Sequence, residues 1–347
     1  MMDEIGGDAV LDATAWEMHV PVAVDAMRRG IAVAMEVGGA YNEEECRELI
    51  RVHKETGTPF MMMENCCYGK EELLATSLAR NGKFGEIVFC QGAYAHDLRS
   101  EIAYGEKLRH YRLRNYQGRN CENYPTHELG PIARLLNITR GNRMVRLSAF
   151  ASKACGLRDY ILEKEDLAHL RDTVFAQGDI VETLITCENG ELIRLRLDTT
   201  LPRYYSREFT VRGTKGLYNQ DANMVHIEGD EFKEYFSTVK TIKENADNAE
   251  SYERYLPAIW RDVDPEILEK GHGGMDWFVF DAFVSALREG KPMPIDVYDA
   301  TAWMCITYLS EISIKNGGAP VQIPDFTDGA YRDRAPVDLV EFPVVCE

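Results

Sequence analysis

Short apolar runs alternate with amphipathic stretches over the first 63 residues, and this alternation restricts the fold more than any other feature of the sequence. The runs at 9–14, 31–36 and 58–63 have the length of buried strands. The stretches at 19–29 and 43–56 place apolar residues at i, i+3, i+4 and i+7, as one face of a helix does. Strands joined through single helices by short links pair in parallel. We therefore expect a parallel α/β unit over residues 1–70.

The rest of the chain, 71–347, has the pattern of an α+β domain. Helices are expected at 70–81 and 124–138 and, later, near 251–256, 264–269, 275–289 and 297–315. Strands are expected at 86–93, 144–151, 179–187, 191–200, 207–212 and 216–219. Asn189-Gly190 is a typical hairpin turn, so we expect these strands to form a large open, mainly antiparallel sheet. A polar, aromatic and basic stretch at 94–123 follows the first of them.

Charge and composition exclude several classes of protein. The chain has 39 Lys and Arg residues against 57 Asp and Glu residues, a net charge of −18, so we expect no nucleic-acid partner. No apolar run approaches the roughly 20 residues that span a bilayer, and the N-terminus lacks a signal peptide's apolar core. We expect a cytoplasmic protein without a membrane partner. The nine cysteines form no CxxC pair, and no metal site is expected.

A series of short motifs runs through the whole chain in a fixed order. They are WEMH (16–19), MEVGGA (35–40), ENCCY (64–68), GAYAHDLR (92–99), YRLRN (111–115), NYPTHELGP (123–131), TLPRYYSR (200–207), RGTKG (212–216) and GHGGMD (271–276). In this order they resemble the Gfo/Idh/MocA oxidoreductases, and most closely the branch classed as glycoside hydrolase family 109. That branch includes NAD-dependent α-N-acetylgalactosaminidases.

The resemblance implies a Rossmann-type NAD-binding domain followed by a substrate domain. Residue 9 would match the fourth strand of the family's Rossmann sheet, and the sequence contains no GxGxxG loop for the pyrophosphate. We therefore expect residues 1–70 to form a truncated Rossmann-type sheet, the C-terminal half of such a domain. Weak NAD binding follows from this expectation.

The resemblance assigns cofactor contacts to residues that follow the three expected parallel strands. They are Trp16, His19, Glu36, Val37 and Asn65. Ligands of open α/β sheets bind at these carboxyl ends. Taken from the residues alone, the spacing favours a tryptophan that caps the core and a histidine that starts a helix, and Asn65 could be a turn residue that caps the next helix. Many dehydrogenases of the wider family carry a catalytic lysine after the glutamate, and Val37 stands there instead, which favours the glycosidase branch.

The resemblance assigns the substrate site to the second domain. Tyr94, Tyr124 and His127 are the expected catalytic residues, and Arg112, Tyr124, His127 and Tyr205 the expected substrate contacts. Tyr124 and His127 are three residues apart, at the start of a predicted helix, so both can face one side. A tyrosine has an ordinary pKa near 10 and needs a nearby cation to act as a base.

Several alternatives stay open at these positions. Arg99 and Arg112 are the expected cations beside Tyr94, although an interface tyrosine and a structural histidine fit the same pattern. The motif at 272–276 either approaches the site or forms a tight turn before the next helix. Tyr204 stands where the family usually has proline, so the assignment of Tyr205 could shift by one residue.

The resemblance implies cleavage of a carbohydrate glycoside, such as an N-acetylgalactosaminide, with NAD as cofactor. The expected sequence is C3 oxidation, C2 deprotonation, elimination, hydration and re-reduction, and it differs from hydrolysis by two paired carboxylates. One alternative is a net sugar or cyclitol oxidoreductase of the same family. Another is an inactive binding or assembly protein. A homo-oligomer formed through the open sheet is expected in each case.

Overall fold

The computed structural model describes residues 6–229, 238 and 248–345. The three strands of the first unit, β1 (Ala9–Asp12), β2 (Ala32–Met35) and β3 (Phe60–Met62), pair in parallel in the order β1-β2-β3. The connecting helices are α2 (Trp16–Arg28) and α3 (Glu43–Thr56). The predicted parallel unit is therefore confirmed.

Helix α3 has the bounds that the sequence predicts, and local chemistry explains both ends. The Asn42 side chain accepts a hydrogen bond from the Glu45 amide at 2.9 Å and caps the first turn. Gly57 adopts a φ of +66°, a left-handed conformation that glycine tolerates, and ends the helix. Leu49, fully buried, belongs to the stripe that packs α3 onto the core.

The second part of the chain forms an eight-stranded sheet in the order β10-β9-β8-β4-β7-β6-β5-β11. Its strands are β4 (Ile87–Ala95), β5 (Met144–Ala151), β6 (Ile180–Cys187), β7 (Leu192–Asp198), β8 (Thr210–Gly213), β9 (Gly216–Asn219), β10 (Met224–Ile227) and β11 (Val321–Gln322). All neighbours are antiparallel except β4 and β7, which are parallel. A large, mainly antiparallel sheet is thus confirmed. The sequence pattern missed β10 and β11.

Further helices precede, connect or follow these strands along the chain. They are α4 (Lys70–Arg80), α5 (Arg99–Ala103), α6 (Gly105–Leu108), α7 (Arg112–Gly118), α8 (Thr126–Leu135), α9 (Gly156–Leu162), α11 (Ala258–Arg261), α12 (Pro265–Leu268), α13 (Met275–Glu289) and α14 (Val297–Lys315). Short 3-10 helices are η1 (Asn65–Tyr68), η2 (Glu165–Leu170), η3 (Ala249–Tyr255), η4 (Gly271–Gly274) and η5 (Ala330–Arg332). The stretch 94–123, expected only as polar chain, therefore holds three short helices. The helix expected near 251–256 is a 3-10 helix.

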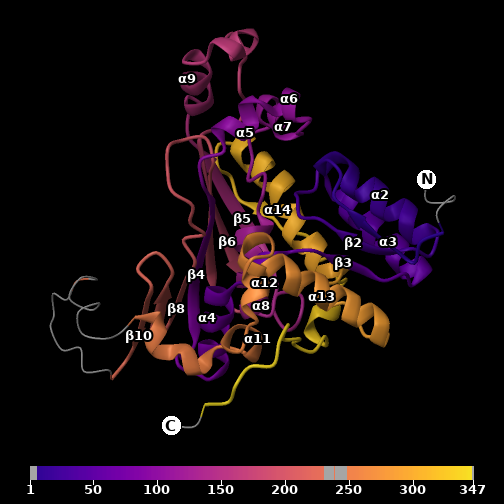
Figure 1. Cartoon of the computed structure of the whole chain (residues 1–347), viewed down its shortest axis with the longest axis vertical. Coiled ribbons are helices and arrows are strands. Elements are labelled where there is room, and N and C mark those ends of the chain that lie inside the picture. Colours follow the sequence, from indigo (N-terminus) through magenta and orange to yellow (C-terminus); the bar gives the residue numbers. More distant parts are fainter. Residues whose placement is uncertain (1–5, 230–237, 239–247, 346–347) are drawn as a thin grey trace.

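Helix α14 runs between the parallel unit and the large sheet (Figure 1). It contacts β5 on one side and α3 and β3 on the other, and Trp303 at its centre is fully buried. Among the described residues, no helix has the combination of length and apolar character that crossing a membrane requires. Helix α14 is therefore the shared core element that fixes one sheet relative to the other.

Some apolar side chains on the large sheet stay exposed. Phe150 on β5 and Leu184 on β6 are 56% and 42% exposed. Near them, Glu182 on β6 pairs with Arg194 and Arg196 on β7 at 2.8 and 2.6 Å. This mixture of apolar and paired charged groups is compatible with a contact between copies, and the homo-oligomer stays a prediction.

The first turn of α14 is fixed by a buried ion-pair network. Asp299, fully buried, accepts hydrogen bonds from Arg140 at 2.5 Å, Thr139 at 2.8 Å and Arg134 at 3.2 Å. Burial alone would raise the pKa of Asp299, but Arg134 and Arg140 outweigh it and lower the pKa. The carboxylate therefore joins α14 to the end of α8 and the turn after it.

The substitution Asp299→Asn is expected to lower the free energy of unfolding by about 3 kcal/mol, because it leaves the buried Arg134 without a carboxylate and Arg140 with Asp296 alone. Urea unfolding measures this loss. Asp25→Asn, which breaks an exposed pair with Arg29 on α2, is the matched control and should cost less than about 1 kcal/mol. Equal losses in the two variants would contradict the assigned role of Asp299.

Candidate active site

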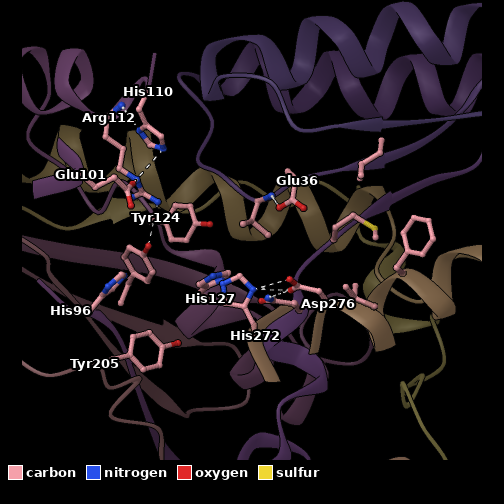
Figure 2. A pocket seen from close by; sticks show the side chains of 17 residues that line it. Glu36, His96, Glu101, His110, Arg112, Tyr124, His127, Tyr205, His272 and Asp276 are labelled. Carbon is pink, nitrogen blue, oxygen red and sulfur yellow. Dashed lines mark hydrogen bonds and ion pairs between the residues drawn. The ribbon is translucent and has the colours of Figure 1, made fainter. Parts of the chain in front are cut away.

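A pocket of about 810 Å³ lies where the parallel strands end against the large sheet (Figure 2). Eight of the ten residues that the sequence assigns to the site line it: Glu36, Val37, Asn65, Tyr94, Arg112, Tyr124, His127 and Tyr205. Glu36 and Val37 follow β2 and Asn65 follows β3, whereas Tyr94 lies on β4, Arg112 opens α7 and His127 lies in the first turn of α8. The pocket therefore brings together segments from both parts of the chain.

Trp16 and His19 do not line the pocket. Trp16 is 4% exposed, and its ring lies 5.5 Å from that of Tyr124 and 4.6 Å from that of Tyr111. His19 is buried, its Nε2 lies 3.0 Å from the Thr14 carbonyl, and burial lowers its pKa. Trp16 thus packs against the pocket residue Tyr124, and His19 contacts the backbone outside the pocket. The contacts of both residues with a cofactor stay predictions.

Three rings form the wall on the side of the large sheet. The ring of Tyr94 lies 4.4 Å from that of Tyr124 and 5.5 Å from that of His127, and the last two are 4.8 Å apart. The Arg112 guanidinium lies over the rings of Tyr94 and Tyr124, at 5.6 and 4.9 Å, and its Nη2 donates to Tyr94 Oη at 3.2 Å. Tyr94 thus has a fixed cation beside its hydroxyl.

The electrostatics at Tyr94 differ from the expectation in two respects. Arg99 does not contribute the expected cation, because it pairs with Asp97 at 2.7 Å and lies over the ring of Tyr160. Burial raises the pKa of Tyr94, and Arg112 only partly opposes this rise. The phenol therefore holds its proton at neutral pH, and base action requires a phenolate that Arg112 stabilises.

His127 is held by a carboxylate that the sequence reasoning missed. Glu64, at the end of β3 and fully buried, lies with Oε1 2.8 Å from His127 Nδ1 and 3.0 Å from the Cys66 amide. A Cβ at Gly130 on α8 would lie 2.8 Å from Glu64 Cγ, so glycine makes room for this carboxylate. With Nδ1 engaged, Nε2 is the nitrogen of His127 left for a ligand. Only the position of Glu64 at a strand end hinted at this role.

A metal could use the same neighbourhood. Donor atoms of Glu64, Cys66 and His127 lie within 4.8 Å of one another. Burial raises the pKa of the Cys66 thiol well above its ordinary value, so the sulfur is protonated at neutral pH and a metal would have to displace that proton. The short contact with His127 engages only Oε1 of Glu64, and Oε2 is buried without a hydrogen-bond partner among the described residues.

A second histidine–carboxylate pair lines the same pocket and is drawn next to His127 in Figure 2. His272 Nδ1 lies 2.8 Å from Asp276 Oδ2, and Asn65 donates to Asp276 Oδ1 at 2.6 Å. The hydrogen bond with Asp276 raises the pKa of His272, and the same bond lowers the pKa of Asp276. His272 and Gly273 have φ values of +50° and +65°, as in a tight turn. His272 and Asp276 also line the pocket, so the motif at 272–276 both forms a turn and approaches the site.

The far end of the pocket holds polar residues that the sequence reasoning did not select. His96 lies 4.9 Å from the ring of Tyr94 and 5.3 Å from that of Tyr205, and burial, with Arg112 nearby, lowers its pKa to about 4. Glu101 and His110 line the same end. Tyr205 lines the pocket, whereas Tyr204 is 70% exposed and does not, so the assignment without a shift fits the structure.

The residues at the parallel strand ends fit the nicotinamide riboside end of NAD. Asn65 Oδ1 is buried without a hydrogen-bond partner in the described part of the chain, and Glu36 lines the same wall. Burial raises the pKa of Glu36, and its carboxyl group accepts hydrogen bonds when ionised and can also donate one when protonated. An amide and ribose hydroxyls offer the complementary donors and acceptors.

Comparisons with known proteins agree with this architecture. Residues 68–333 match the family described as "Glycosyl hydrolase 109, C-terminal domain". A glycosyl hydrolase family 109 protein of Stenotrophomonas maltophilia is 40% identical and covers 97% of this chain and 76% of its own length. An alpha-N-acetylgalactosaminidase of Tannerella forsythia is 38% identical, covering 95% of this chain and 73% of its own length.

Solved structures show the same fold at lower identity. A levoglucosan dehydrogenase in complex with NADH and levoglucosan has a TM-score of 0.65 and 18% identity, and covers 91% of this chain and 80% of its own. An oxidoreductase from Agrobacterium radiobacter in complex with NAD+, L-tartaric acid and magnesium has a TM-score of 0.61 and 14% identity, and covers 93% and 82%. The chain thus shares its fold with these two oxidoreductases.

Replacing Asp276 with Asn is expected to lower the pKa of His272, because the charged partner that favours the imidazolium is lost. Titration of the His272 ring protons by NMR measures the change: in the unsubstituted protein they should titrate above 6.5, and in the variant at a lower pH. The exposed substitution Asp25→Asn should leave this titration unchanged. A His272 pKa that does not move in Asp276→Asn would show that the pair does not hold the proton.

Proposed function

This chain belongs to glycosyl hydrolase family 109, and from that premise we propose that its pocket cleaves glycosides of N-acetylgalactosamine-like sugars with NAD and without net oxidation. The observation that supports this most is the arrangement of the pocket. Groups suited to a nicotinamide, Glu36 and Asn65, face groups suited to a sugar, Tyr94, Tyr124 and His127. A sugar between them has one face toward each set.

When bound, NAD+ would accept hydride from C3 of the sugar and later return it, which makes the C2 proton acidic in between. The protein's own groups then have three tasks: to hold the sugar, to move protons and to exclude water. Arg112 Nη1 is buried without a hydrogen-bond partner among the described residues and is a donor for a sugar oxygen. Tyr205, half exposed at the rim, offers its ring to the sugar face.

His127 and Tyr124 are proposed to act at the C3 hydroxyl. Because Glu64 engages Nδ1, the Nε2 atom of His127 can accept the hydroxyl proton, and Glu64 stabilises the resulting imidazolium. Glu64 is thus a positioning residue for His127. The adjacent Tyr124 ring fixes the imidazole plane from 4.8 Å.

Tyr94 is proposed to remove the C2 proton. Burial disfavours the phenolate that this step requires, and the Arg112 guanidinium, which donates to the hydroxyl oxygen, is the group that stabilises it. Tyr205 also accepts from an arginine, Arg207 at 3.0 Å, but Arg207 is bound to Glu72 at 2.6 Å. The Arg112 Nη1 atom beside Tyr94, in contrast, has no hydrogen-bond partner among the described residues. The proposed role of Tyr94 therefore depends on Arg112.

His272 is proposed to protonate the departing glycosidic oxygen. Asp276 raises its pKa and so keeps the imidazolium populated near neutral pH, while its side chain remains 65% exposed and accessible to a ligand. Proton delivery to the leaving group and proton removal from the C3 hydroxyl are then carried by different histidines, His272 in η4 and His127 in α8.

The test of this function is an assay with p-nitrophenyl N-acetyl-α-galactosaminide and millimolar NAD+, because weak NAD binding is expected from a chain without a GxGxxG loop. Over many turnovers we expect nitrophenol release with no net change at the nicotinamide absorbance band. NADH formed in proportion to sugar consumed would instead establish a net oxidoreductase. No turnover with saturating NAD+ would support the binding-protein alternative and refute the proposal.

A further inference from the structure

Arg112 is the one arginine among the described residues that line the pocket, and no lysine lines it. Its side chain is fixed by the rings of Tyr94, Tyr124 and Trp16, at 5.6, 4.9 and 5.1 Å from the guanidinium carbon. A guanidinium presented in this way is the usual partner of a carboxylate or sulfate group, which it binds through two parallel hydrogen bonds. Without a neighbouring carboxylate, Arg112 would favour the binding of an anionic sugar in this pocket.

Glu101 already occupies one edge of this guanidinium. Its Oε1 lies 2.8 Å from Arg112 Nε, and His110 Nε2 lies 3.4 Å from the same oxygen. Glu101 comes from α5 and Arg112 from α7, so two separate helices converge to make the pair. The Glu101 side chain is 37% exposed and lines the pocket, so its charge faces an incoming ligand.

The remaining lining groups do not restore a positive potential. Glu36 and Asp276 add two more carboxyl groups to the wall. His96 and His110 lie beside Arg112, and their lowered pKa values leave both imidazoles neutral near pH 7. The imidazolium of His272 is matched by Asp276 at 2.8 Å. A second negative charge placed near Arg112 would therefore meet Glu101 without a free cation to balance it.

We propose that Glu101 neutralises Arg112 and thereby restricts this pocket to uncharged sugars, excluding uronic acids and sulfated sugars. The inference rests on the proposed function only in taking the ligand to be a sugar. It makes Glu101 a specificity-determining residue: Arg112 keeps its buried Nη1 donor for a neutral oxygen and loses the edge that would clamp an anion.

The test compares the binding of N-acetylgalactosamine with that of galacturonate, by calorimetry and without turnover. The unsubstituted protein should bind galacturonate at least tenfold more weakly. In Glu101→Gln the ratio of the two affinities should fall at least tenfold, because Arg112 becomes free to bind the carboxylate. Glu106→Gln on α6, an exposed residue paired with His169 at 3.4 Å, removes the same charge outside the pocket and should leave the ratio unchanged.

An unchanged ratio in Glu101→Gln, including a proportional loss for both sugars as expected from a merely structural role, would overturn the inference. An equal change in Glu106→Gln would overturn it as well, because the effect would then be long-range charge. The two proposals fail separately: the predicted ratios without glycoside turnover would refute the function alone, and turnover with an unchanged ratio would refute the role of Glu101 alone. Binding of neither sugar would refute both.

Discussion

The hydrogen bond between Glu64 and His127 joins the two parts of the molecule at the point where the chemistry is proposed. Glu64 lies two residues after β3 of the parallel sheet, and His127 lies in the first turn of α8, which contacts β4 of the large sheet, so neither part alone contains the pair. A fully buried carboxylate is costly without a partner, and the imidazole is the partner that this site supplies. The orientation of this imidazole, proposed to be catalytic, therefore depends on the relative placement of the two sheets, which α14 fixes.

The carboxylates of the pocket are mostly engaged, and this limits the reaction that the pocket can perform. Asp276 pairs with His272 and Glu101 with Arg112, as Glu64 does with His127. Conventional glycosidases need two carboxyl groups flanking the scissile bond, one as acid and one as nucleophile or base. In the proposed mechanism the acid and base functions are assigned instead to imidazoles and a phenol, and cleavage proceeds through an acidified C2 proton.

Much of the fold follows from local sequence signals. Helix α3 has an asparagine cap, a single buried stripe and a glycine stop, and α13 and α14 are long, apolar and bounded by Gly274 and Asp296, so their ends could be predicted. Strand β11 was missed because its two residues are too few to display an alternation, whereas β10 was missed although it has the same four-residue length as the predicted β9. The sequence motifs contain the residues that were predicted for the site, and eight of these ten residues line the pocket. The partners Glu64, Glu101 and His110 were not, because their roles arise only when folding brings them to residues elsewhere in the chain; Glu64 and His127 are 63 positions apart.

The central claim, that this pocket cleaves a glycoside through loss of the C2 proton, is tested most directly by turnover in deuterated water followed by NMR of the released sugar. The account predicts deuterium at C2 of the product, and loss of both product and label in Tyr94→Phe. Tyr204→Phe, an exposed neighbour of the pocket residue Tyr205, should behave like the unsubstituted protein. Product that retains its original hydrogen at C2 would contradict the account.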